Sequence, residues 1–262
     1  MTPDPVAAKV GERLPPPGAP LTAIYTPLRR MAEAGNAAAA CRLAFDLNEC
    51  RMRDTRGKSS ELFKRPSTGK ADPMSEKAQK RAAQRESTCA GFPVEETVLA
   101  WDFALASAQA GNRHARLMVV RSPVGLDMMR PENTLEGWME WRREAPSILE
   151  AGVREGDPVM FRLAAGAYSQ VFFGGRLFPE DRDRALAHLL ALRGAVAPTY
   201  RAAFEREIEQ VSKSWIKADP GLLQRAEALA RSLPPVRPAQ PGGFDWSNGI
   251  VPSEDGSPCE GP

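Results

Sequence analysis

Histidine is the side chain most often used as a general base, and this chain of 262 residues holds two, His114 and His188. A nucleophilic site also needs a hydroxyl or thiol beside the base and an acid that orients the base. The sequence has no G-x-S-x-G motif and no cysteine next to an obvious base. His114 directly precedes the small residue Ala115, and His188 lies within an expected helix. Both positions therefore favour helix packing or a helix surface over catalysis.

Carboxylate pairs and phosphate-binding loops give no stronger indication of catalysis. Glu205 and Glu207 are two residues apart on an expected helix and face different directions, whereas Glu205 and Glu209 share a face that also carries basic residues. Neither G-x-x-x-x-G-K-[ST] nor G-x-G-x-x-G occurs. The sequence predicts a protein that is not an enzyme and has no cofactor. A hydrolase whose groups converge from distant positions stays open as an alternative, with a cleft near His114 or His188.

The four cysteines could bind metal or form disulfides. Because no C-x-x-C or Cys/His spacing occurs, no metal site is predicted. Cys41 and Cys50 lie on one expected helix, about 13.5 Å apart along its axis, which is too far for a disulfide. A bond between Cys50 and Cys89 would close a loop of roughly 40 residues. Free thiols in a reducing compartment are the alternative. Cys259, in an expected flexible tail, is predicted to have no structural role.

Large aromatic residues are the candidates for binding another protein. Trp138 and Trp141 are spaced i and i+3, so they share a helix face, and tryptophan is favoured at binding hot spots. Packing of these rings between neighbouring helices is the alternative. The full set of partner-binding candidates is Tyr25, Trp101, Trp138, Trp141 and Tyr168.

Residues 52–90 form an expected insertion that is strongly basic. Between Arg51 and Arg85 there are eleven Lys or Arg and four acids, a local charge of +7 in a chain of net charge +2. Such an arm could bind nucleic acid or an anionic membrane. Only Phe63 could stack on bases, which favours a solvated insertion instead. The basic candidates are Arg51, Arg53, Lys58, Lys64, Arg65, Lys77, Lys80 and Arg81.

One sequence pattern occurs twice. A large aromatic residue is followed about ten residues later by Ala-Gly-Asn, and then by an alanine and an aliphatic residue at four-residue steps. The two copies are Tyr25, Ala34-Gly35-Asn36, Ala39 and Leu43, and Trp101, Ala110-Gly111-Asn112, Ala115 and Val119; a looser copy is Gly156-Asp157, Met160, Ala164 and Tyr168. Glycine suits the left-handed residue that ends a helix, and asparagine can cap the next helix. Small residues four apart would also let helices approach closely. The alternative is a bundle of ordinary amphipathic helices.

This pattern resembles the Sel-one-like branch of the tetratricopeptide repeat superfamily. The matching residues are Ala32, Ala34, Gly35, Ala39 and Leu43, and Ala108, Ala110, Gly111, Ala115 and Val119. The resemblance covers residues 21–50 and 93–121 well and 134–170 weakly. The copies are 76 and then 45 residues apart, whereas the family's regular unit is in the mid-thirties. The resemblance implies an adaptor, a regulator or an envelope-associated scaffold, and seldom an enzyme.

Capping patterns predict the helices. Asp-Pro pairs at 72–73, 157–158 and 219–220 and a capping box at Asn133 and Glu136 mark helix starts. Helices are expected near 21–34, 37–51, 74–86, 93–110, 113–121, 134–153, 158–169, 180–193, 196–214 and 220–232. Only Val171–Phe173 looks like a strand. The predicted fold class is all-α, an irregular α-solenoid of antiparallel helical hairpins. Residues 1–20 and 234–262, rich in proline or glycine, are expected to be disordered tails around a domain at 21–233.

Composition is typical of a soluble globular protein, with 42% hydrophobic and 26% charged residues. No run approaches the roughly 18 apolar residues that cross a bilayer. The residues after Met1 do not form a signal peptide, so the chain is either cytoplasmic or a mature exported form. The cysteines and a proline-rich tether at Val10–Pro20 favour a periplasmic or envelope-tethered form.

The predicted function is a non-catalytic protein–protein interaction scaffold that binds a protein or peptide, with nucleic acid as an unlikely partner.

Overall fold

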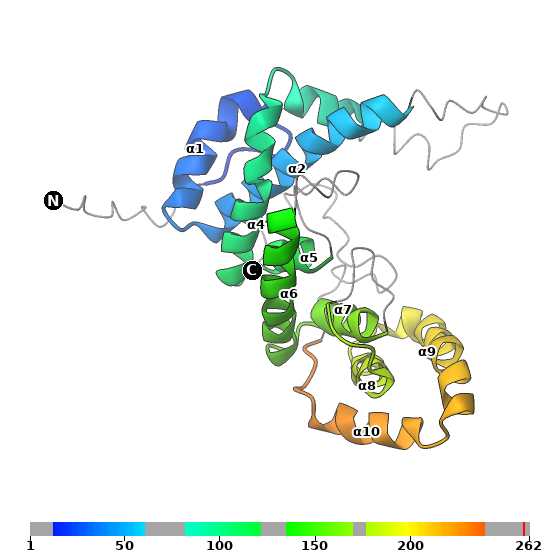
Figure 1. Ribbon diagram of the computed structural model, residues 1–262. Coiled ribbons are helices and arrows are strands. Elements are labelled where there is room, and N and C mark those ends of the chain that lie inside the picture. The colour runs from blue at the N-terminus through cyan, green and yellow to red at the C-terminus, as the bar shows by residue number, and fades with distance from the viewer. Residues whose placement is uncertain (1–12, 61–81, 122–134, 170–176, 239–258, 260–262) are drawn as a thin grey trace. The chain divides into compact units, whose positions relative to one another are not determined.

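The computed structural model describes residues 13–60, 82–121, 135–169, 177–238 and Cys259 (Figure 1). All regular secondary structure in these ranges is helical, which confirms the all-α class. Several predicted features lie outside the described residues. They include the start of the N-terminal tail, the Asp72-Pro73 pair with most of the helix expected at 74–86, Asn133, Val171–Phe173 and most of the C-terminal tail. The solenoid arrangement and the disordered tails stay predictions.

The chain divides into two compact units. Unit 1 consists of Met1–Ala115, Val124–Pro131 and Gly256–Pro262, and unit 2 of Arg116–Pro123 and Glu132–Asp255. Unit 1 holds α1 (Leu21–Glu33), α2 (Ala37–Ser60), a helical stretch over 82–89, the 3-10 helix η1 (Val94–Leu99) and α4 (Ala100–Gln109); α5 (Arg113–Arg121) begins there. Unit 2 holds α6 (Leu135–Arg154), α7 (Pro158–Tyr168), α8 (Arg182–Leu192), α9 (Pro198–Ala218) and α10 (Leu222–Ser232).

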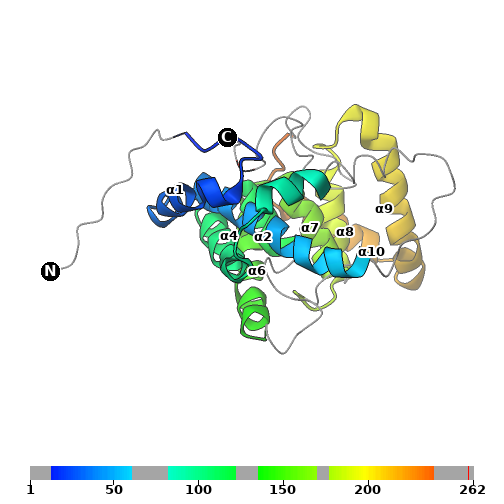
Figure 2. The same cartoon turned by 90° about the horizontal axis from the view of Figure 1, so that it is seen from above.

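Each unit has its own apolar core. In unit 1, α2 packs against both α1 and α4, and Leu28, Leu43 and Leu47 are completely buried. In unit 2, α8 packs against α7 and α10, with Phe161 and Leu186 completely buried. Figures 1 and 2 show α9 beside this group. The contacts of α9 with α8 and α10 are few, so α9 is the most peripheral helix of unit 2.

The repeated sequence pattern folds into the same corner three times. Gly35, Gly111 and Gly156 have φ values of 89°, 91° and 76° and end the preceding helix. In each corner the next residue donates its backbone N–H to the carbonyl five residues before it, at 3.0 Å: Asn36 to Met31, Asn112 to Ser107 and Asp157 to Gly152. This bonding is the Schellman motif.

The same polar residue then caps the following helix. Oδ1 of Asn36 accepts the N–H of Ala39 at 3.0 Å, and Oδ1 of Asn112 accepts the N–H of Ala115 at 3.0 Å. Oδ1 of Asp157 accepts the N–H of Val159 at 2.8 Å. One residue therefore closes one helix with its backbone and opens the next with its side chain.

The structure corrects the expectation of a close helix approach at Gly35. A Cβ atom added there would meet no atom within 4 Å, and the residue lies beyond the end of α1. Gly35 and Ala39 therefore do not share a helix face. Glycine is needed at position 35 because the backbone there is left-handed. In the repeated pattern, the alanines that follow the corners, Ala39 and Ala115, are the residues whose small size suits a fully buried position.

Gly35→Ala should lower the free energy of unfolding of unit 1 by about 1 kcal/mol, because an L side chain is strained at this φ. Gly194 is the matched control, since it also has open space around its Cα but no positive φ. Gly194→Ala should leave the stability of unit 2 unchanged or raise it by up to about 1 kcal/mol. Denaturant melts monitored by hydrogen exchange in each unit give both values. Equal effects of the two substitutions would contradict the assignment.

Two disulfides tie unit 1 together. Cys50 and Cys89 are bonded, with their Cα atoms 5.3 Å apart, as the sequence indicated. Cys41 is bonded to Cys259, 218 residues away, with a Cα separation of 5.6 Å. The carbonyl of Cys259 also accepts a hydrogen bond from Nδ2 of Asn112 at 3.4 Å. The prediction that Cys259 has no structural role is therefore wrong.

Candidate binding groove

Three of the five aromatic candidates lie inside the cores and offer no surface to a partner. Trp101, Trp141 and Tyr168 are 5%, 0% and 7% exposed. Trp138 is half-buried and packs edge-on against Trp141, with ring centroids 5.4 Å apart. Tyr25 is half-buried and donates its hydroxyl to Glu96 at 2.6 Å. Trp138 and Trp141 therefore pack against each other, which agrees with the packing alternative for these two tryptophans.

The structure locates little of the predicted basic patch. Arg51 lies half-buried on α2. Arg53 and Lys58 also belong to α2, but their side chains are outside the described part of the structure. Lys64, Arg65, Lys77, Lys80 and Arg81 lie outside the described residues altogether. Binding through this segment stays a prediction.

His188 has a packing role in unit 2. Its Nδ1 lies 2.7 Å from the carbonyl oxygen of Arg184, one turn earlier on α8. Its ring stacks on Tyr168 at 5.6 Å and contacts Phe161 at 5.6 Å. Burial lowers the pKa of His188, and the bond to the Arg184 carbonyl opposes this shift. These contacts join α7 to α8.

His114 is held in its neutral form by burial, which lowers the pKa of its imidazole to about 4. Its ring packs edge-on against Phe45 of α2, at 6.0 Å between centroids, and its Nδ1 is buried with no hydrogen-bond partner. Protonation of His114 would therefore place a charge in an apolar contact between α2 and the start of α5.

Acid should destabilise unit 1 through His114. The folded-state pKa of about 4 lies below the ordinary value of 6.5, so between these pH values only the unfolded state binds the proton. From pH 7 to pH 5 the free energy of unfolding of wild-type unit 1 should fall by about 2 kcal/mol more than that of His114→Phe. Urea titrations at both pH values measure this difference, and groups common to both proteins, such as Asp46, cancel. Parallel pH profiles would exclude the mechanism.

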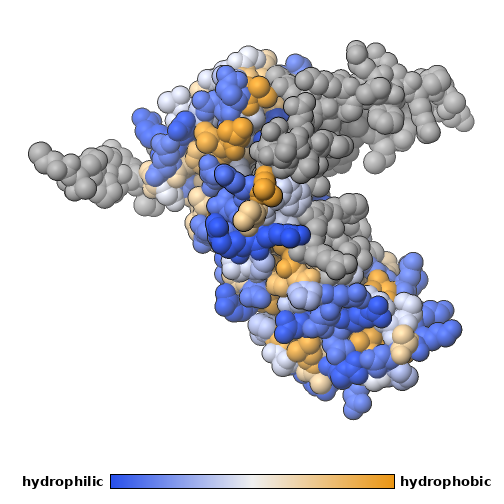
Figure 3. Space-filling view, viewed as in Figure 1, coloured by the Kyte–Doolittle hydropathy of each residue, from blue (hydrophilic) through white to orange (hydrophobic). Residues whose placement is uncertain are grey.

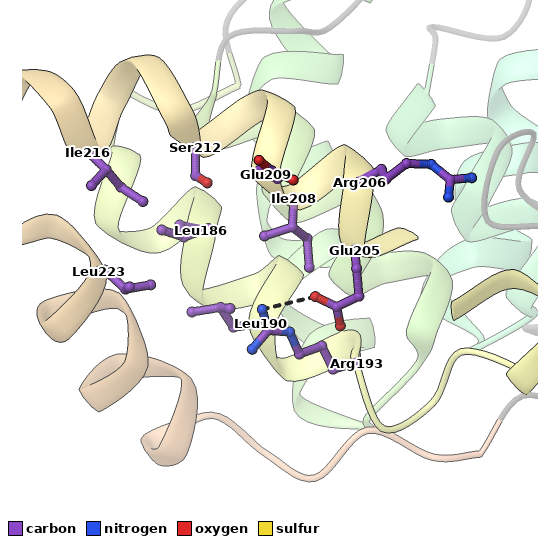
Figure 4. A pocket seen from close by; sticks show the side chains of 10 residues that line it. All are labelled: Leu186, Leu190, Arg193, Glu205, Arg206, Ile208, Glu209, Ser212, Ile216 and Leu223. Atoms are coloured by element: carbon purple, nitrogen blue, oxygen red, sulfur yellow. Dashed lines mark ion pairs between the residues drawn. The ribbon is translucent and has the colours of Figure 1, made fainter. Parts of the chain in front are cut away.

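The surface shown in Figure 3 is mainly polar, with smaller apolar areas between the charged side chains. One hollow in unit 2 is lined by α8, α9 and α10 (Figure 4) and has a volume of about 330 Å³. Its apolar lining residues are Leu186, Leu190, Ile208, Ile216 and Leu223, and its polar ones are Arg193, Glu205, Arg206, Glu209 and Ser212. We refer to these ten residues as the groove.

The groove has an apolar end and a charged end. Ile216 and Leu223 lie at one end, and the Arg193–Glu205 ion pair lies at the other (Figure 4). Nη2 of Arg193 and Oε2 of Glu205 are 3.0 Å apart. Both side chains of the pair are largely exposed, so solvent screens it and it adds little stability. Such a pair can exchange its partner for a charge on a bound molecule at low cost.

The buried stripe of α9 contributes to one wall of the groove. Phe204, Ile208 and Ser212 are spaced by four residues and are the buried residues of this helix. Ile208 and Ser212 also line the groove, so one face of α9 serves both the core of unit 2 and the groove.

Ion pairs also connect the helices that line the groove. Arg225 of α10 donates to Asp183 of α8 at 2.8 Å and to Asp219 at the end of α9 at 2.6 Å. On the other side of α9, Glu207 is paired with Arg162 of α7. Burial raises the pKa of Glu207 and Arg162 opposes that shift. These contacts connect α9 to α7, α8 and α10 despite its few packing contacts.

The chain matches no protein-family model, no curated protein and no solved structure. Within the described ranges, no helix is long and apolar enough to cross a membrane. Across the same residues, no group of three or more His, Cys, Asp or Glu side chains is arranged to hold a metal ion. The groove is therefore the feature of the described residues on which a function can be proposed.

The sequence alone does not predict the groove. Glu205 and Glu209 share a helix face with basic residues, and no sequence pattern singles out Ile208, Ile216 or Leu223. The four-residue spacing of Phe204, Ile208 and Ser212 was readable in the sequence. However, the groove needs three helices, and no local pattern specifies which helices meet.

Proposed function

We propose that this protein is a non-catalytic protein–protein interaction module that captures an apolar segment of a partner protein in the groove. The observation that carries the proposal is an open apolar hollow in which Leu186, Leu190 and Ile208 converge, with charges at one end. Grooves of this composition hold the apolar face of a peptide or helix, while rim charges set its orientation.

The size of the groove favours a short segment. Its lining on α9 runs from Glu205 to Ile216, about 16 Å along the helix axis or about three turns. A volume near 330 Å³ is at the lower end for small-molecule sites. A few large side chains from one face of a partner helix would fill it. The exposed side chain of Leu223, at 38%, is placed to make the first contact.

The three similar corners support this class of function, because they agree with the resemblance to helical-repeat adaptors, which bind rather than catalyse. The two disulfides favour an oxidising compartment, and we propose the cell envelope or another exported location.

Leu223→Glu should weaken binding of the partner at least about tenfold, because a carboxylate would be desolvated against apolar side chains. Leu135→Glu is the matched control, since Leu135 is a 63% exposed leucine of the same unit that does not line the groove. The partner is first isolated from extracts of the source cell with wild-type protein, and its Kd is then measured by calorimetry for all three proteins. If both substitutions have the same effect, the groove is not the binding site.

A further inference from the structure

The disulfides of unit 1 are nested: the first cysteine pairs with the fourth, and the second with the third. Two of these cysteines, Cys41 and Cys50, belong to the same helix, α2. All four side chains are buried, with exposures of 0% for Cys41, 3% for Cys50, 0% for Cys89 and 1% for Cys259. The folded protein therefore shields both bonds from an external thiol, so the pairing must be settled before unit 1 packs.

In the unfolded chain a different pair meets most often. Cys41 and Cys50 are nine residues apart, whereas the native pairs are 39 and 218 residues apart. From the length dependence of loop closure, contact between Cys41 and Cys50 is favoured about ninefold over Cys50–Cys89 and about a hundredfold over Cys41–Cys259. Oxidation of the unfolded chain thus begins with a non-native bond.

That first bond is incompatible with the fold. Nine residues of α-helix separate Cys41 and Cys50 by about 13.5 Å along the axis, and a disulfide needs Cα atoms within about 7 Å. A Cys41–Cys50 bond prevents α2 from forming between these residues. Since α2 packs against both α1 and α4, the whole core of unit 1 is blocked until the bond is exchanged.

We propose that this protein is a client of a thiol–disulfide isomerase, which converts an early Cys41–Cys50 bond into the native nested pairs. In the exchange, the isomerase thiolate opens the Cys41–Cys50 bond and forms a mixed disulfide with Cys50. The Cys89 thiolate then attacks Cys50, the Cys50–Cys89 bond forms, and the isomerase leaves as a thiolate. Cys41 is left as a thiol, and this step involves no net oxidation.

The second native bond needs an oxidant. Cys41 and Cys259 together lose two electrons and two protons to a disulfide such as oxidised glutathione, which is reduced to two thiols. In this route Cys41 becomes available to Cys259 once the isomerase has released it from Cys50.

The test is oxidative refolding of the reduced full-length chain in a glutathione buffer, with and without a purified disulfide isomerase. Aliquots are alkylated and their bonds are mapped by mass spectrometry. The wild-type chain should accumulate the Cys41–Cys50 species early, and the isomerase should speed the appearance of both native bonds at least about fivefold. Absence of the Cys41–Cys50 species, or a rate that the isomerase leaves unchanged, overturns the proposal.

Two variants serve as controls. Cys41→Ala with Cys259→Ala retains only the Cys50–Cys89 pair, and Cys50→Ala with Cys89→Ala retains only Cys41–Cys259. Neither variant can form the Cys41–Cys50 bond, so the isomerase should change their rates of bond formation less than about twofold. Bond mapping reads this result whether or not a variant reaches the native fold. Equal acceleration of the variants and the wild type would overturn the proposal.

Discussion

Replacing Cys41 and Cys259 together by alanine is expected to lower the free energy of unfolding of unit 1 by about 4 kcal/mol. The bond closes the longest loop in the chain, with a sequence separation of 218 residues. For a fully unfolded loop of this length the chain-entropy relation gives about 5 kcal/mol, and a folded unit 2 within the loop shortens its effective length. Both cysteines are also buried, so their removal loses packing in addition.

Hydrogen exchange of the amides in α2 during urea titration measures this loss within unit 1. The matched comparison is Cys50→Ala with Cys89→Ala, which opens a loop of 39 residues. By the same relation that variant should lose slightly less than about 4 kcal/mol, so the two disulfides should stabilise unit 1 by similar amounts. A loss below about 1 kcal/mol for the Cys41 and Cys259 variant would mean that this bond does not hold unit 1 together.

Trp141→Ala is expected to cost unit 2 about 3–5 kcal/mol in free energy of unfolding. The indole is completely buried on α6, and its Nε1–H donates to the carbonyl oxygen of Val119 at 2.8 Å. Truncation leaves a large cavity and an unpaired buried carbonyl. Trp141→Phe keeps much of the ring and should cost about 1–3 kcal/mol, mainly because it removes the donor.

Trp138 provides the control on the same helix. Its ring packs on Trp141 but is only half-buried, so Trp138→Ala should cost less than about half of the effect of Trp141→Ala. Urea unfolding followed by exchange of the α6 amides ranks the three variants. If Trp138→Ala proves the more destabilising of the two alanine variants, Trp141 is not the anchor between α6 and the chain around Val119.

The helices could be predicted well because their ends depend on neighbouring residues. Asp157 caps α7 and Pro158 occupies its first turn, as the Asp-Pro pair indicated. Helices expected at 113–121 and 220–232 appear as Arg113–Arg121 and Leu222–Ser232. The segment expected as one helix at 93–110 is divided into η1 and α4, and α2 continues to Ser60 beyond the expected end at 51.

Contacts between residues far apart in the sequence are harder to predict from the sequence. Cys50 and Cys89 lie close enough in sequence for a loop argument, whereas nothing near Cys259 indicates Cys41 as its partner. The groove depends in the same way on α8, α9 and α10 meeting. Gly35 illustrates a third case: its left-handed backbone at the end of a helix is predicted correctly, whereas the predicted close approach of a second helix is absent.

Site-specific photocrosslinking tests most directly whether the groove receives a partner. A photoreactive amino acid is placed at Leu223 in one protein and at Leu135 in another, and each is irradiated in the source cell. We expect a discrete covalent adduct with one partner protein from position 223 and none from position 135, because Leu223 lines the groove and Leu135 does not. An adduct of equal yield from both positions, or none from position 223, would contradict it.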